Sequence, residues 1–226
     1  MSRLWIRSPA PRGGKELGGL AELAGVPVEW GAESDLEALV APDARSQGLI
    51  LEAGPLPELE LAQLLAIPPE EQPLTVALDE VEDPQNVGAI ARSAEAAGAR
   101  ALLLTRRRAP PLSPAVSRAS AGAIEHLPVI RATNLARALD ELGECGHWRI
   151  GADGGPDAQP YWEASGLWRS PTVLVLGSEE HGLRPGVRSK LDLRIRVPMH
   201  GRVESLNVAA AAAVLLFEAA RSRRAT

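Results

Sequence analysis

The chain has 226 residues and 45% hydrophobic content, which allows one large soluble domain or a main domain with a small companion, and its net charge of −5 argues against indiscriminate nucleic-acid binding. No apolar run approaches the roughly 18 residues of a membrane span and the amino terminus has no apolar signal region, so we expect a cytoplasmic protein. Cys145 is the only cysteine and the four histidines lack metal-ligand spacing, so an internal disulfide is excluded and no metal site is expected.

The first part of the chain alternates short strand and helix patterns. The expected strands are Leu4–Arg7, Val26–Trp30 and Gly48–Glu52, and the expected helices are Gly14–Ala24 and Asp35–Leu39. Residues 1–54 are therefore expected to form a small α/β unit.

Two proline-rich breaks, Gly54–Pro57 and Ile67–Pro73, follow this unit. They predict a linker with a short helix over residues 55–73 and a main domain over residues 74–226. The expected strands of that domain are Leu74–Leu78, Ala101–Leu104, Pro128–Arg131, Trp148–Ala152, Thr172–Leu176 and Leu193–Val197, and the expected helices are Val87–Ala97, Ser113–Ala121, Leu135–Leu142, Pro185–Ser189 and a final one after Ser205. Such alternation predicts an α/β fold, a mostly parallel sheet with helices on both faces.

Three loops at the carboxyl ends of strands carry polar residues where a packed core would have none. They are Asp79–Asn86, Gly177–Leu183 and Pro198–Val208. Open α/β sheets bind ligands in a crevice at this edge, so we expect the loops to form one site. Ser205 is expected at the N-cap of the final helix, and either Asp83 or Asn86 at the N-cap of the helix after the first loop.

The residues alone favour a site that positions its substrate over one that supplies a nucleophile, because no Ser-His-Asp arrangement or reactive cysteine is visible. Arg92, Glu179, Ser205 and Asn207 are the candidates, two charged and two neutral residues at one edge of the sheet. The loop Gly177–Gly182 lacks the Lys-Ser/Thr pair of a P-loop, and the chain has no dinucleotide-binding glycine fingerprint.

The first loop is rich in carboxylates, namely Asp79, Glu80, Glu82 and Asp83. They could hold Mg²⁺ in a phosphotransferase, since hard cations take carboxylate oxygens. No basic motif of such an enzyme accompanies them, so a solvated acidic loop is favoured.

Arginine supplies nearly all the positive charge and gathers near the three loops. The clusters are Arg106–Arg108 and the group Arg184, Arg188, Lys190, Arg194 and Arg196. Solvated faces and phosphate contacts both remain open. The final helix is apolar nearly all round, with small residues at Ala209–Ala213, so either deep burial or contact with a second subunit is expected.

Three segments resemble, in order, the motifs of the SpoU family of RNA ribose 2′-O-methyltransferases in the SPOUT superfamily. They are Asp83–Ala94, Leu176–Leu183 and Pro198–Val208. The resemblance covers about Leu74 to Arg221, and Ser120–Ala123 with Asn134–Leu135 also resemble the bacterial branch that methylates a guanosine of large-subunit ribosomal RNA.

The resemblance implies a C-terminal deep trefoil knot in which S-adenosylmethionine binds and through which two copies form a homodimer. It implies that Gly177, Gly182, Val197, Met199 and Leu206 lie around the methyl donor. It also implies that the catalytic positions are Asn86, Arg92, Glu179, Ser205 and Asn207, with Arg92 reaching the partner's site. Because arginine stays protonated, we expect Arg92 to pair with an RNA phosphate and stabilise alkoxide charge, leaving proton removal to Glu179 or water.

Residues 1–54 resemble the ribosomal-protein-like RNA-binding unit that often precedes this catalytic domain, beginning at what would be its second strand. The expected function is therefore methylation of a ribose 2′-hydroxyl in structured RNA, with a guanosine of 23S ribosomal RNA as the favoured target and transfer RNA as the alternative. An RNA-binding assembly factor without catalysis is the rival from another class. No membrane partner is expected.

Overall fold

The computed structural model describes residues 2–40, 46–68 and 74–224, which divide into two compact units, Met1–Pro55 and Leu56–Thr226. The smaller unit contains strands β1 (Arg3–Arg7), β2 (Val28–Gly31) and β3 (Leu49–Glu52) and helices α1 (Gly14–Leu23) and α2 (Glu33–Glu37). Strand β1 lies in the middle of the sheet, parallel to β2 and antiparallel to β3. Leu4, Ile6 and Leu36 are buried in its core. The α/β character expected for this unit is present.

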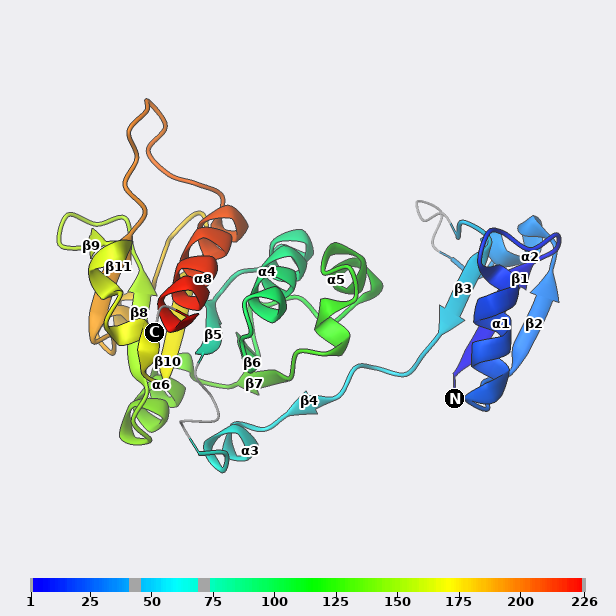
Figure 1. Ribbon diagram of the computed structural model, residues 1–226, viewed down its shortest axis with the longest axis horizontal. Coiled ribbons are helices and arrows are strands. Elements are labelled where there is room, and N and C mark those ends of the chain that lie inside the picture. Colours follow the sequence, from blue (N-terminus) through cyan, green and yellow to red (C-terminus); the bar gives the residue numbers. More distant parts are fainter. Residues whose placement is uncertain (1, 41–45, 69–73, 225–226) are drawn as a thin grey trace. The chain divides into compact units, whose positions relative to one another are not determined.

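The larger unit, whose strands are labelled in Figure 1, is built on one sheet. The sheet has eight strands, and every pairing in it is parallel. Its order is β4-β7-β6-β5-β10-β8-β11-β9. The strands are β4 (Glu58–Leu59), β5 (Leu74–Asp79), β6 (Ala101–Thr105), β7 (Val129–Ala132), β8 (Trp148–Ala152), β9 (Gln159–Pro160), β10 (Thr172–Gly177) and β11 (Leu193–Arg196). The predicted parallel sheet is confirmed.

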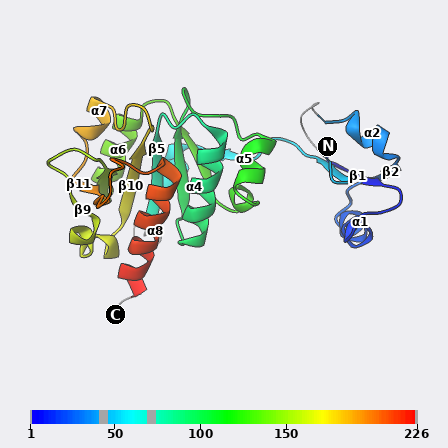
Figure 2. The ribbon, with the colours of Figure 1, turned by 90° about the horizontal axis from the view of Figure 1, so that it is seen from above.

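Helices cover both faces of this sheet, as predicted (Figure 2). The α-helices are α3 (Leu61–Leu65), α4 (Pro84–Ala96), α5 (Pro114–Ala119), α6 (Leu135–Glu144), α7 (Pro185–Arg188) and α8 (Val208–Arg224), and the short 3₁₀ turns are Ala123–Glu125, Tyr161–Ala164 and Leu167–Arg169. Alternate β5 residues face opposite cores: Val76 belongs to the core that contains residues of α4, α5 and α8, and Ala77 to the core that contains residues of α3, α6 and α7. A central parallel strand is buried on both sides for this reason.

The segment expected to be a linker belongs in part to the larger unit. Strand β4 pairs with β7. In addition, Glu58 Oε1 lies 2.9 Å from Nε of the buried Arg131. The boundary between the compact units is therefore at Pro55–Leu56, and the expectation of a linker over 55–73 was wrong for residues 56–68. A two-residue strand has too short a pattern to be recognised in the sequence.

No helix in the ranges that the structure describes combines the length and hydropathy needed to cross a bilayer.

A three-bond ion pair joins β8 to the residue before β11. Asp192 Oδ2 accepts from the backbone N of Arg149 at 2.8 Å and from its Nε at 2.9 Å. Asp192 Oδ1 accepts from Arg149 Nη2 at 2.6 Å. The hydrogen bond from the guanidinium is the main reason that the pKa of Asp192 lies below its ordinary value. A lowered carboxyl pKa stabilises the fold at pH values above the unfolded pKa and loses this effect as acid protonates the folded group.

We predict that Asp192→Asn lowers the free energy of unfolding by about 1.5 to 3 kcal/mol near neutral pH. The difference from the wild type should hold down to about pH 4, the ordinary carboxyl pKa, and shrink below it. Urea unfolding at a series of pH values measures this. Asp157→Asn, at a carboxylate that is 75% exposed, is the control and should have little effect at any pH.

Candidate functional site

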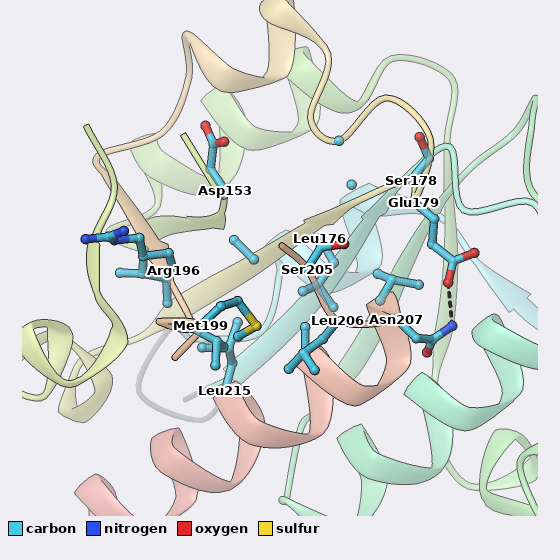
Figure 3. A pocket seen from close by; sticks show the side chains of 18 of the residues that line it. Asp153, Leu176, Ser178, Glu179, Arg196, Met199, Ser205, Leu206, Asn207 and Leu215 are labelled. Atoms are coloured by element: carbon cyan, nitrogen blue, oxygen red, sulfur yellow. Dashed lines mark hydrogen bonds between the residues drawn. The ribbon is translucent and has the colours of Figure 1, made fainter. Parts of the chain in front are cut away.

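A cavity of about 420 Å³ opens at the carboxyl ends of β8, β10 and β11, against the start of α8 (Figure 3). Its lining residues are Ala152, Asp153, Gly154, Leu176, Gly177, Ser178, Glu179, Gly182, Ile195, Arg196, Val197, Met199, Glu204, Ser205, Leu206, Asn207, Val208, Ala211 and Leu215. All five residues that the resemblance places around a donor lie in this wall, as do Glu179, Ser205 and Asn207. Two of the three predicted loops, those after β10 and β11, therefore meet here.

The turn after β10 folds back tightly on the end of its strand. Gly182 N donates to Ser178 O at 2.9 Å, and Gly182 has a φ of 63°, the left-handed region that glycine adopts without strain. A Cβ on Gly177 would collide with the backbone of Gly182 and Leu183. Glycine at both positions is thus a requirement of the turn, and the turn forms one wall of the cavity.

The remaining predicted loop, Asp79–Asn86, contacts the other two through the side chain of Asn86. This side chain is largely buried, and the residue is only 7% exposed. Asp83 caps α4 by accepting from Gln85 N at 2.9 Å, which settles the cap in favour of Asp83. Asn86 is consequently free to bond elsewhere, and its Oδ1 accepts from Asn207 Nδ2 at 3.0 Å.

Asn207 joins the three loops. Its Nδ2 donates to Asn86 Oδ1 and also to Glu179 Oε1, the bond drawn as a dashed line in Figure 3. Its Oδ1 accepts from Ala209 N at 2.9 Å and from Ala210 N at 3.3 Å. One side chain therefore uses both its donor and its acceptor atoms, the first for the neighbouring loops and the second for its own helix.

These contacts correct the predicted cap of the final helix. Helix α8 begins at Val208, so the residue placed to accept from its first free amides is Asn207 and not Ser205. Ser205 instead lines the cavity from the loop before the helix.

Arg92 does not join this cluster. It lies six positions beyond Asn86 on α4, on the exposed side of the helix, outside the cavity wall. No hydrogen bond or ion pair to its side chain occurs among the residues that the structure describes. The prediction that all the candidate residues share one edge of the sheet is thus not met for Arg92 within a single chain.

The acidic loop was expected to be solvated, but Asp79 is fully buried. Arg184 contacts both of its carboxylate oxygens, so those oxygens are not available for Mg²⁺. Burial lowers the pKa of Arg184, but the bonds to Asp79 and the charges of Asp79 and Glu80 outweigh it and raise the pKa overall. Across the described ranges, no cluster of three potential metal-ligating side chains occurs.

Most members of the basic clusters are already paired with carboxylates. Among them, Arg106 pairs with Glu60, Arg108 with Glu80, Arg184 with Asp79, Arg188 and Arg194 with Asp153, and Lys190 with Asp140. A cationic side chain that is paired with a carboxylate contributes less to a phosphate-binding surface than an unpaired one. Of the two alternatives left open by the sequence, solvated faces and phosphate contacts, this pairing favours solvated faces for most members of the clusters.

Sequence reasoning missed Asp153 and Glu204, which also line the cavity. Asp153 directly follows β8, and β8 is the neighbour of β10 in the sheet. The carboxyl end of that strand was a usable signal, since every strand end at this edge can contribute to the crevice.

The three loops and the Asn207 contacts that join them lie within the part of the chain that a protein-family model matches. The model of the "SpoU rRNA Methylase family" matches residues 73–217. The chain belongs to this family. Among its relatives, the "Putative TrmH family tRNA/rRNA methyltransferase YacO" of Bacillus subtilis (strain 168) is 37% identical over 224 residues, which cover 98% of this chain and 88% of the relative. The "23S rRNA (guanosine-2′-O-)-methyltransferase RlmB" of Pseudomonas putida is 37% identical over 202 residues, 88% of this chain and 79% of the relative.

Solved methyltransferase structures have a fold similar to that of this chain. An AdoMet-bound rRNA methyltransferase from Sinorhizobium meliloti has a TM-score of 0.78 at 26% identity, covering 97% of this chain and 79% of that one. The SpoU methyltransferase AviRb from Streptomyces viridochromogenes, in complex with AdoMet, has a TM-score of 0.74 at 26% identity, covering 100% of this chain and 84% of that one. Both support the parallel α/β fold of the larger unit.

We predict that Asn207→Asp destabilises the protein at neutral pH, although aspartate can still cap α8. The new carboxylate would replace the amide donor to Asn86 and Glu179 and would lie beside the carboxylate of Glu179. Denaturant unfolding should show that the deficit shrinks as the pH is lowered toward about 4, where one carboxyl takes up a proton. Asn134→Asp is the matched control, since Asn134 caps α6 through the same acceptor. A deficit of equal size in the control would contradict the prediction.

Proposed function

We propose that this chain transfers a methyl group from S-adenosylmethionine to a ribose 2′-hydroxyl of structured RNA, with a guanosine of 23S ribosomal RNA as the target. The observation that carries the proposal is the meeting of Asn86, Glu179 and Asn207, one residue from each family motif, at the rim of the cavity. The names of the relatives support the target, and a ribosomal RNA substrate implies action in the cytoplasm. The printed name of the Bacillus relative keeps transfer RNA as the alternative.

The cavity fits a donor of this kind. Its volume lies within the roughly 300 to 1,000 Å³ of small-molecule sites. Leu176, Met199, Leu206 and Leu215 give it an apolar floor, while its ends are polar (Figure 3). The carboxylates of Glu179 and Glu204, which form no ion pair with a described residue, suit a cationic ligand. We assign the hold on the donor to the loop backbone at Gly177, Val197 and Leu206, with Met199 and Gly182 nearby, and all five residues line the cavity.

When bound, S-adenosylmethionine supplies an electrophilic methyl group on sulfur. The residues of this chain would then have to hold a ribose oxygen in line, about 3 to 3.5 Å from its target atom, and help to remove its proton. We assign proton removal to Glu179 or water. Asn207 holds the Glu179 carboxylate through Oε1, so Oε2 remains for a hydroxyl. Asn86, Ser205 and Asn207 orient the reacting groups.

We assign Arg92 to the site of a partner subunit, where its permanent charge would pair with an RNA phosphate and stabilise a developing alkoxide. Its exposed position outside the cavity supports this. Helix α8 offers the surface for a second copy, because Val214 and Phe217 are 37% and 53% exposed on it, next to the small residues Ala210 and Ala213. A C-terminal trefoil knot is part of the proposal, supported by the crossover from β10 past β8 to β11 and by the return of α8 onto α4.

A first test concerns the donor site. We predict that Gly177→Ala weakens S-adenosylmethionine binding by about tenfold or more, because relieving the collision with Gly182 and Leu183 must move the turn, at a cost of about 1 to 3 kcal/mol. Isothermal titration calorimetry measures the affinity. The matched control is Gly186→Ala in α7, where a Cβ would meet nothing within 4 Å. Equal affinities for all three proteins would rule out this site.

The reaction itself is tested by transfer of labelled methyl groups to unmodified 23S ribosomal RNA and, separately, to transfer RNA. We expect label on the ribosomal RNA and a loss of about a hundredfold or more for Arg92→Ala. Arg137→Ala, at an exposed arginine on α6, is the control and should retain activity. Label on transfer RNA alone would overturn the target. Donor binding without label on either RNA would favour a binding factor.

A further inference from the structure

Asp79 and Arg184 lie 105 residues apart and form the ion pair with the most buried carboxylate near the site. Asp79 Oδ2 accepts from Arg184 N at 2.9 Å, and Oδ1 accepts from Nε at 2.8 Å and lies 2.7 Å from Nη2. A carboxylate with no exposed surface is tolerated only when charge and hydrogen bonds compensate it. Arg184 provides both.

Glu80 extends the pair toward a second basic residue. Its Oε1 lies 2.8 Å from Arg184 Nη1, and its Oε2 accepts from Arg108 Nη1 at 2.9 Å. Glu80 has a φ of 58°, a left-handed conformation that is strained for a residue with a side chain. Strain of this kind persists only where the surroundings fix the residue, and here two guanidinium groups do so.

These contacts join the bases of the two loops whose tips meet at Asn207. Asp79 ends β5 and leads into the loop that carries Asn86, and Arg184 directly follows the turn that carries Glu179. A second cavity of about 260 Å³ lies between the loops, and its lining residues include Glu80, Asn86, Arg108 and Glu179. The loops are therefore connected at the tip by one side-chain amide and at the base by the ion pair.

We propose that Asp79, Arg184 and Glu80, here called the ion clamp, are positioning residues for the methyl transfer. The clamp holds the turn that carries Glu179 at a fixed place relative to Asn86 and Asn207. The proposal rests on the proposed function, because the rate it controls is that of methyl transfer. None of the three clamp residues lines the donor cavity, so we assign them a role that acts through the turn and not through contact with the donor.

The chain contains a matched control for a purely structural role. Arg149 and Asp192 make the same three contacts, one from a backbone amide and two from a guanidinium, but at the amino ends of β8 and β11. The active-site loops lie at the opposite, carboxyl edge. Disrupting the control pair removes the same set of contacts, at a carboxylate that is 24% exposed, without touching these loops.

The experiment compares Asp79→Asn, Arg184→Lys and Asp192→Asn. In Asp79→Asn an amide donor would face the donors of Arg184, and in Arg184→Lys one ammonium cannot replace the separate contacts to Asp79 and Glu80. We expect kcat, at saturating donor and RNA, to fall about tenfold or more in Asp79→Asn and by less in Arg184→Lys, while KM for RNA stays within about threefold. Hydrogen exchange in peptides spanning residues 178–184 should be faster in both clamp variants. Asp192→Asn should show neither change, although it loses stability.

Unchanged kcat in folded Asp79→Asn, or an equal loss in Asp192→Asn, would overturn the clamp. If Asp79→Asn does not fold, Glu80→Gln, at a side chain that is 16% exposed, is judged by the same criteria. If the wild type methylates no RNA, the proposed function fails, and the exchange measurement still decides the clamp: unchanged exchange over 178–184 would overturn it.

Discussion

The side-chain amide of Asn207 is the contact on which the site depends. Its oxygen accepts from the first free amides of α8, and its nitrogen donates to Asn86 and Glu179. Capping of the last helix and assembly of the site therefore depend on one side chain, because the same residue ends the third loop and joins the other two loops. An aspartate would preserve only the helix cap, and an alanine would preserve neither function.

The parallel sheet explains why residues so far apart in the sequence meet. Parallel strands all end at one edge, so the loops after β5, β10 and β11 are brought together whatever their separation along the chain. This much follows from the alternation of strand and helix patterns, and the prediction of a parallel sheet covered on both faces is confirmed. The same pattern could not reveal β4, because its two residues join the larger unit through pairing with β7 and a salt bridge to Arg131.

Side-chain partners were the least predictable part of the site. A carboxylate next to a loop reads as solvated unless its partner is known, and the partner of Asp79 is 105 residues away. The cap of α8 was misplaced by two positions, since Ser205 and Asn207 are both good N-cap residues and only the start of the helix at Val208 distinguishes them. The five residues expected around the donor came from the resemblance to the SpoU motifs and not from local propensity, and all five line the cavity.

The distribution of charge sets a constraint on RNA binding. With a net charge of −5 and most arginines near the site paired to carboxylates, general attraction for the phosphate backbone is small. Paired arginines instead fix loop positions, as Arg184 does for the turn that carries Glu179. Affinity for RNA must then come from unpaired cations such as Arg92 and from shape. Such a charge distribution fixes the positions of the active-site loops and keeps nonspecific affinity for RNA low. Both properties suit modification of a single ribose within a folded RNA.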